Sequence, residues 1–159
     1  MKNIVLILFL YFSFISNSYS AGSSGGETKS KYDQAVKLIN AAKKNEEKGK
    51  QNKAEKNFKK ALKLLVKSNE LKPNKADTLN YLGFTSRKLG DYDSAEKYYL
   101  QGLQLKPNHR GINEYLGELY VATNRHNLAI ERLKVLESCN CVEYEDLKSI
   151  IAGEKVSKY

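Results

Sequence analysis

A chain of 159 residues is long enough for one modest domain. Its 27 lysines and arginines outnumber its 18 aspartates and glutamates, giving a formal net charge of +9. The sequence contains no phosphate-binding glycine loop, no zinc-protease motif and no nucleophile elbow. We therefore expect a protein that is not an enzyme, needs no cofactor and takes no small-molecule substrate.

The first 20 residues have the layout of a cleavable export signal. Lys2 is followed by an apolar run over residues 4–15, and Ser18 and Ser20 are the small residues expected before a cleavage site. We expect cleavage between Ser20 and Ala21 and delivery to the periplasm. A retained membrane anchor is the alternative, although a run of twelve residues, rising about 1.5 Å each, is too short for a hydrocarbon core of roughly 30 Å. Membrane association is expected only if this segment is retained.

The basic excess is concentrated in the lysine-rich residues 29–75. We interpret this stretch as a solvated lysine face, with attraction to an anionic membrane surface or an acidic partner as the alternative. Export argues against a nucleic-acid partner, and the lysines do not form a patterned recognition helix.

Residues 21–31 are rich in glycine, serine and lysine, and we expect a flexible leader there. From Tyr32 onward, apolar residues recur at helical spacing, and no useful stretch alternates as a strand does. Gly49 suits a helix end, and Pro73 and Pro107 end the helices that precede them. The apolar positions predict six helices, over residues 32–48, 54–72, 79–89, 92–105, 112–120 and 128–136.

The motif LKPN occurs at residues 71–74 and again at 105–108, a spacing of 34 residues. The segments LNYLG and NEYLG, together with Ala95 and Ala129, recur at the same interval. With two helices in each period, the pattern resembles the tetratricopeptide repeat. This resemblance implies an all-α, right-handed solenoid of antiparallel helix pairs. We expect a degenerate first hairpin over residues 32–74, repeats over 75–108 and 109–141, a capping helix over 142–153 and a frayed tail over 154–159.

A narrower resemblance, over residues 32–153, is to a bacterial family of exported tetratricopeptide proteins. It rests on YDQAVKLI, on the two repeats, and on a cysteine pair followed by VEYEDLKSIIAG. It implies a small periplasmic repeat protein and supplies no known reaction. Within the repeats, Gly83 and Gly117 are expected to let neighbouring helices approach closely.

Cys139 and Cys141 stand where a third LKPN would fall. In an oxidising compartment, the pair is expected to form an intrachain disulfide that fixes the turn before the capping helix. A redox-active pair, an intermolecular bridge and a metal site are the alternatives. No metal is expected, because only His109 and His126 could add imidazole ligands.

The repeat resemblance implies that the first helix of each pair lines a groove for a peptide or protein partner. Tyr81 and Tyr115 lie one repeat apart and would form an aromatic platform, unless both rings pack between repeats. We therefore expect a non-enzymatic interaction module of the periplasm. A thiol-redox or metal-handling protein and a membrane-tethered scaffold are the alternatives. The candidate groove residues are Asp77, Asn80, Tyr81, Phe84, Arg87, Lys88, Glu114, Tyr115 and Glu118.

Overall fold

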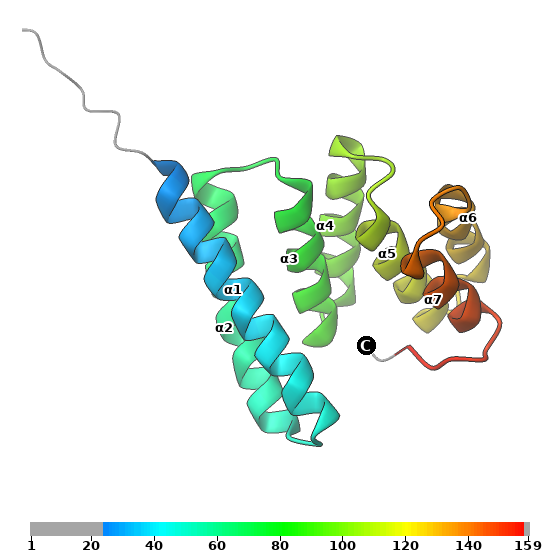
Figure 1. Cartoon of the computed structure of the whole chain (residues 1–159), viewed down its shortest axis with the longest axis horizontal. Helices are drawn as coiled ribbons and strands as arrows, with labels where there is room; N and C mark the ends of the chain where they lie inside the picture. The colour runs from blue at the N-terminus through cyan, green and yellow to red at the C-terminus, as the bar shows by residue number, and fades with distance from the viewer. Residues whose placement is uncertain (1–23, 158–159) are drawn as a thin grey trace, which may run out of the picture.

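The structure is a computed structural model that describes residues 24–157, and in this range it contains seven helices and no strand (Figure 1). The all-α prediction is confirmed. The expected export signal, with its cleavage site between Ser20 and Ala21, lies outside the described residues. The helices are α1 (Ser24–Glu47), α2 (Gln51–Leu71), α3 (Ala76–Lys88), α4 (Tyr92–Leu105), α5 (Arg110–Ala122), α6 (His126–Leu136) and α7 (Val142–Ile151).

Successive helices pair as hairpins that stack in chain order. α1 packs on α2, α3 on α4, and α5 on α6. α2 also contacts α3, and α4 contacts α5, so each hairpin covers an apolar side of the one before it. α7 packs on both α5 and α6 and covers the last hairpin (Figure 1). This arrangement confirms the predicted helical repeat solenoid.

Two boundaries differ from the sequence prediction. α1 begins at Ser24, so most of the leader expected to be flexible over residues 21–31 is helical. Extending a helix that has already nucleated costs little for each further residue. The described part of the predicted frayed tail, residues 154–157, is also held in place, because Lys155 and Ser157 contact side chains of the array.

The two LKPN motifs end α2 and α4. Lys72 and Lys106, which precede the prolines, have extended φ values of −144° and −143°. A following proline disfavours helical geometry at such positions. The turn inside each hairpin contains a residue with left-handed geometry, namely Gly49, Gly90 or Asn124 at φ values of 67°, 84° and 59°. The hairpin turns therefore use the residue types that tolerate this backbone conformation.

Close helix contact at Gly83 and Gly117 is confirmed, but different residues fill the two spaces. A Cβ atom at Gly83 would overlap the ring of Tyr99, which is fully buried on α4 of the same hairpin. Leu133 is the equivalent of Tyr99 in the next repeat, yet it is only half-buried. Leu147 of α7 reaches Gly117 instead, where an added Cβ would lie 2.5 Å from its Cδ2 atom. The capping helix thus supplies the side chain that the last repeat lacks.

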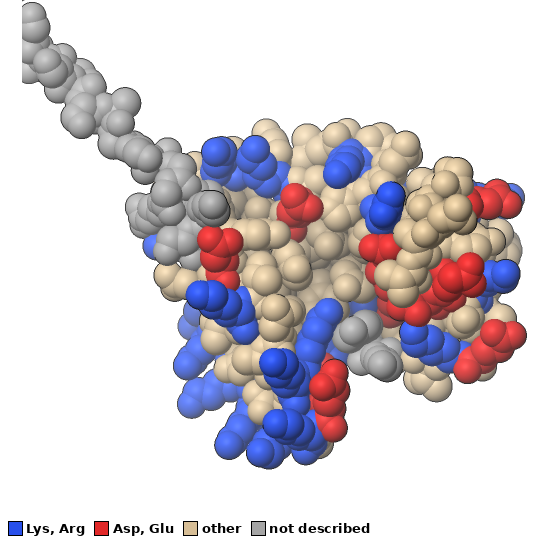
Figure 2. All heavy atoms as spheres, in the orientation of Figure 1, with Lys and Arg blue, Asp and Glu red and all other residues tan. Residues whose placement is uncertain are grey.

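The lysines of α2 lie on its outer surface. They alternate with buried residues such as Phe58 and Leu65, which face the core shared with α1 and α3. Basic side chains are prominent over this first hairpin in Figure 2. This placement agrees with a solvated lysine face, made of Lys53, Lys56, Lys59, Lys60, Lys63 and Lys67.

Candidate functional site: the inner face of the array

The helices α1, α3, α5 and α7 contact one another in series and form one surface, called the inner face below. The segment that follows α7 turns back toward the middle of this surface (Figure 1). Every groove residue predicted from the sequence lies on α3 or α5. The structure therefore places all of the predicted residues on the helices of this face, although they differ in exposure.

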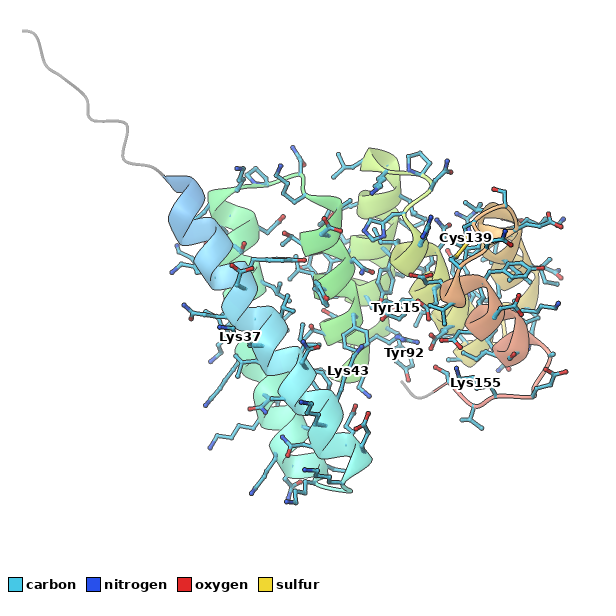
Figure 3. The ribbon with its side chains drawn as sticks, in the orientation of Figure 1. Lys37, Lys43, Tyr92, Tyr115, Cys139 and Lys155 are labelled. Carbon is cyan, nitrogen blue, oxygen red and sulfur yellow. A yellow bond between two sulfur atoms is a disulfide. The ribbon has the colours of Figure 1, made fainter. Side chains whose placement is uncertain are left out.

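Aromatic side chains connect the helices of the inner face. Tyr81 packs edge-on against Tyr32 of α1, with ring centroids 5.8 Å apart, and Phe84 lies 5.2 Å from Tyr115. The Lys43 ammonium of α1 lies 4.5 Å from the centre of the Phe84 ring and 6.0 Å from that of Tyr115 (Figure 3). Tyr81 and Tyr115 therefore pack between repeats, while remaining only half-buried.

Two predicted cations of α3 are paired within the fold. Arg87 Nη1 lies 3.2 Å from Glu118 Oε2 on α5, and each of these side chains is only 1% exposed. Lys88 Nζ lies 2.5 Å from a carboxylate oxygen of Glu46 on α1. These pairs join α3 to its neighbours on both sides, so Arg87 and Lys88 hold the inner face together.

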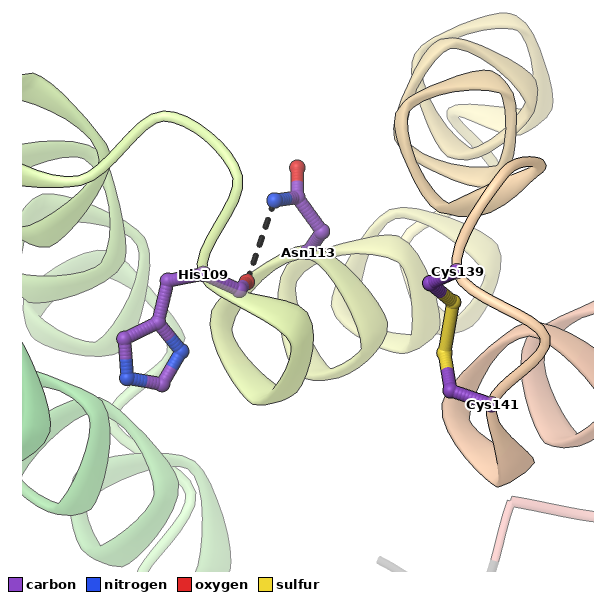
Figure 4. The surroundings of a disulfide bond; sticks show 4 residues. All are labelled: His109, Asn113, Cys139 and Cys141. Carbon is purple, nitrogen blue, oxygen red and sulfur yellow. Dashed lines mark hydrogen bonds between the residues drawn. A yellow bond between two sulfur atoms is a disulfide. The ribbon is translucent and has the colours of Figure 1, made fainter.

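A hydrogen-bonded cluster fixes the start of α5. The Ile112 backbone N–H donates to Nδ1 of His109 at 3.2 Å, so Nε2 of the same ring donates to Asp77 Oδ1 at 3.0 Å. The Asn113 side-chain amide donates to the His109 carbonyl at 3.1 Å (Figure 4). Asn80 is buried nearby, whereas the Asp77 side chain is 75% exposed. The cluster orients α5 and leaves Asp77 accessible at the rim of the inner face.

A cavity of about 270 Å³ lies between α5 and α7. We call it the acidic pocket, because Glu114 and Glu118 of α5 and Glu143 and Asp146 of α7 contribute to its lining. Acidic side chains gather over this part of the molecule in Figure 2. The rest of the lining consists of Tyr115, Val142, Ile150 and Lys155.

The environment of the acidic pocket changes the titration of Glu114. Burial, and after it the charges of Glu118, Asp146 and Glu143, together raise the pKa of Glu114 from 4.5 to about 8. Lys43 acts in the opposite direction on this pKa. Most molecules therefore hold Glu114 protonated at neutral pH, and a cation entering the pocket would favour its ionised form.

Sequence analysis missed five of the eight residues that line the acidic pocket. Glu143 and Asp146 lie on the capping helix, which has no place in the repeat consensus, and Lys155 lies in the tail expected to fray. One available signal was the spacing of three between Glu143 and Asp146, because residues at that interval share one face of a helix. That spacing indicates only that Glu143 and Asp146 share a helix face, as Glu114 and Glu118 do on α5.

Cys139 and Cys141 form a disulfide in the turn between α6 and α7 (Figure 4), with their Cα atoms 5.2 Å apart. Asn140 between them has a φ of 47°, which bends the turn enough to bring the sulfurs together. Within residues 24–157, no group of three or more histidine, cysteine, aspartate or glutamate side chains is arranged to hold a metal ion. No helix in that range is both long and apolar enough to span a bilayer.

The family profile described as tetratricopeptide repeat matches residues 33–108, which span the first two hairpins. No curated protein sequence matches the chain. Among solved structures, the chain is similar to the first tetratricopeptide domain of Spaghetti (RPAP3) bound to the HSP90 peptide SRMEEVD. The TM-score is 0.55 at 17% sequence identity, over 79% of this chain and 96% of that one.

A second similar structure is the type III secretion translocator chaperone SycD of Yersinia enterocolitica. It has a TM-score of 0.55 and 18% identity, over 77% of this chain and 89% of that chain. MamA is a third, with a TM-score of 0.46 and 18% identity, over 79% and 86% of the two chains. At these identities, the first two structures establish a shared fold and nothing about shared ligands.

Proposed function

Because the chain is a tetratricopeptide repeat protein, we propose that it is a non-enzymatic interaction module that binds a peptide segment of a partner protein on its inner face. The observation that carries this proposal is the combination of half-buried tyrosines and the acidic pocket on one continuous surface. Aromatic anchors beside a few fixed polar groups are typical of peptide-binding surfaces.

Two similar proteins support the choice of ligand class. The Spaghetti domain is described as bound to a peptide, and SycD is described as a chaperone of a secretion translocator. Arg87 and Lys88 are paired with Glu118 and Glu46. The inner face therefore does not present these two cations as the centre of a binding site for an anionic ligand. The acidic pocket and the exposed Asp77 side chain are the polar features of the described inner face that remain to select a ligand.

The proposed setting is the periplasm. It is supported by the export signal expected over residues 1–20 and by a disulfide pair suited to an oxidising compartment. N-terminal sequencing of the protein from a periplasmic fraction should begin at Ala21. An intact Met1 in a membrane fraction would instead identify a tethered scaffold.

Affinity capture from a periplasmic extract tests the function. Alanine at Tyr81 or Tyr115 would disturb packing, so the sharper bait carries Glu143→Lys and Asp146→Lys, which reverse charge on the inner face of α7. A matched control bait carries Glu131→Lys on α6, where the wild-type side chain is 58% exposed. A partner retained by the wild-type and control baits but lost from the inner-face bait supports the proposal. Identical proteins recovered on all three baits would contradict it.

A further inference from the structure

The acidic pocket contains a buried carboxyl group, that of Glu114, which lies among other acidic side chains. Glu114 is 8% exposed, and Lys43 of α1 is the cation that lowers its pKa. It lines the cavity together with the carboxylates of Glu118, Glu143 and Asp146. Removing several carboxylates from water is unfavourable unless a cation or hydrogen-bond donors accompany them. The acidic side chains of the pocket therefore favour a positively charged group in addition to Lys43 and Arg87, which the helices supply.

The chain's own tail shows which kind of cation fits. Lys155 lines the pocket and places its Nζ atom 2.5 Å from Asp146 Oδ1 (Figure 3). Its pKa is raised, chiefly because the ammonium hydrogen-bonds to Asp146. Two residues further on, the Ser157 hydroxyl donates a hydrogen bond to the Glu118 carboxylate. A short segment outside the helices, with a lysine and a hydroxyl two positions apart, thus contacts acidic residues of both α5 and α7.

We propose that the acidic pocket is the subsite of the inner face that accepts a lysine or arginine side chain of a peptide ligand, and that Lys155 occupies its edge when no ligand is bound. The inference rests on the proposed function and names the chemistry of the partner as a basic peptide segment. An organic ammonium or guanidinium suits the site better than a metal ion, since the carboxylates in the described range do not converge as metal ligands. The apolar and aromatic lining would contact the methylene stem of such a side chain.

The tail is held weakly enough to be displaced. Lys155 and Asp146 are 36% and 34% exposed, and ion pairs this accessible to water contribute only about 0.2–1 kcal/mol. The backbone N–H groups of Glu154 and Lys155 both donate to the Ser149 carbonyl, at 3.0 and 3.2 Å, and hold the segment where it leaves α7. Val156 is 86% exposed and adds no apolar anchor. A peptide that places its cation deeper, toward Glu114, would compete successfully with Lys155.

Fluorescence anisotropy with a labelled synthetic peptide, EKVSKY, tests the subsite. This peptide has the sequence of residues 154–159. The full chain carrying Lys155→Ala and Ser157→Ala should bind it at least fivefold more tightly than wild type. In wild type, the tethered tail competes at an effective concentration in the millimolar range. Equal affinity of the two proteins for the peptide, or no binding by either, would overturn the proposal.

Matched controls test whether the peptide binds in the acidic pocket and whether its lysine ammonium group is recognised there. In the tail-variant background, Glu143→Gln with Asp146→Asn should weaken peptide binding at least fivefold. Glu145→Gln, on an exposed position of the same helix, should leave it unchanged. The peptide EAVSKY should bind at least fivefold more weakly than EKVSKY. Equal binding of the two peptides would show that the site does not recognise the ammonium group, and the proposal would fail.

The two proposals fail in distinguishable ways. If no partner depends on the inner face in the capture experiment but the peptide binds the tail variant, the interaction function is wrong and the cation subsite stands. If a partner depends on the inner face but the lysine peptide does not bind the tail variant, the subsite is wrong and the interaction function stands.

Discussion

The guanidinium of Arg87 and the carboxylate of Glu118 meet 3.2 Å apart in the interior between α3 and α5, and only 1% of either side chain is exposed. Each side chain comes from the first helix of its own repeat, so the pair crosses the repeat boundary. An ion pair buried this deeply holds its partners in one geometry, because either charge left alone would be poorly solvated.

Breaking this pair should destabilise the fold strongly. Arg87→Met leaves the Glu118 carboxylate buried without its counter-charge and should lower the free energy of unfolding by about 3–5 kcal/mol. The double variant Arg87→Met/Glu118→Leu should recover much of the loss. Urea denaturation followed by circular dichroism measures both.

An exposed ion pair provides the control for that experiment. Lys67 and Glu70 on α2 lie 3.3 Å apart, with side chains 57% and 58% exposed. Lys67→Met should change the free energy of unfolding by less than about 1 kcal/mol. A loss from Arg87→Met no larger than the loss from Lys67→Met would show that the buried pair is not a structural link.

Gly83→Ala should lower the free energy of unfolding by about 1–3 kcal/mol, because the added methyl group would overlap the buried ring of Tyr99. The matched test is a double-mutant cycle with Tyr99→Leu, which removes most of the obstructing ring. Gly83→Ala should cost clearly less in the Tyr99→Leu background than in wild type. Equal costs in both backgrounds would contradict the packing seen at this position.

Stability should fall as the pH rises through the range in which Glu114 loses its proton. Its pKa is about 8 in the folded chain against 4.5 ordinarily, so the protonated form favours folding and stability declines between these values. Glu114→Gln should flatten this decline and raise the free energy of unfolding at pH 8.5. The gain is about 1.4 kcal/mol for each unit of the pKa shift that is removed.

The pH profile needs a control carboxylate on α7 that does not line the pocket. Burial and the carboxylates of Glu118, Asp146 and Glu143 raise the pKa of Glu114, while Lys43 lowers it. Glu145→Gln changes an exposed carboxylate on α7 and should leave the slope between pH 5 and pH 8.5 unaltered. If Glu114→Gln and Glu145→Gln have the same profile as wild type, Glu114 does not titrate in this range.

Removing the disulfide should have a small effect on stability. Cys139 and Cys141 close a very short loop, so the bond restricts the unfolded chain little. The variant Cys139→Ser/Cys141→Ser should lose at most about 2 kcal/mol and keep its helix content. Thermal denaturation of wild type with a thiol reductant is the matched comparison and should give the same midpoint as the variant. Unfolding of wild type at room temperature on reduction would assign the bond a larger role.

Sequence patterns predicted the fold because the packing of repeats requires particular residue types at a fixed spacing along the chain. The prolines of LKPN end α2 and α4, and Gly83 marks a close helix contact. The same consensus could not show that Leu147 of α7, rather than Leu133, packs against Gly117. Leu147 takes the place of Leu133 because of the angle at which α7 packs on α5. The repeat spacing of the sequence does not specify that angle.

The candidate site was predictable only in part. Placement of Tyr81 and Tyr115 on the inner face follows from the repeat period, but the burial of Arg87 depends on Glu118 from another repeat. The acidic pocket is formed by α5, α7 and the tail. Of these, α7 and the tail lie outside the repeat consensus. Long-range contacts of this kind come from stacking and are absent from any single repeat.

Glu118 is shared between two partners, since it pairs with Arg87 on one side and accepts a hydrogen bond from Ser157 on the other. A ligand that displaces the tail would remove the Ser157 hydrogen bond from Glu118 and keep the ion pair with Arg87. Loss of the Ser157 hydrogen bond would therefore act directly on the Arg87–Glu118 pair that joins the second and third hairpins. The curvature of the whole array should respond to what lies across it, and small-angle X-ray scattering of the wild-type and tail-variant chains would register that response.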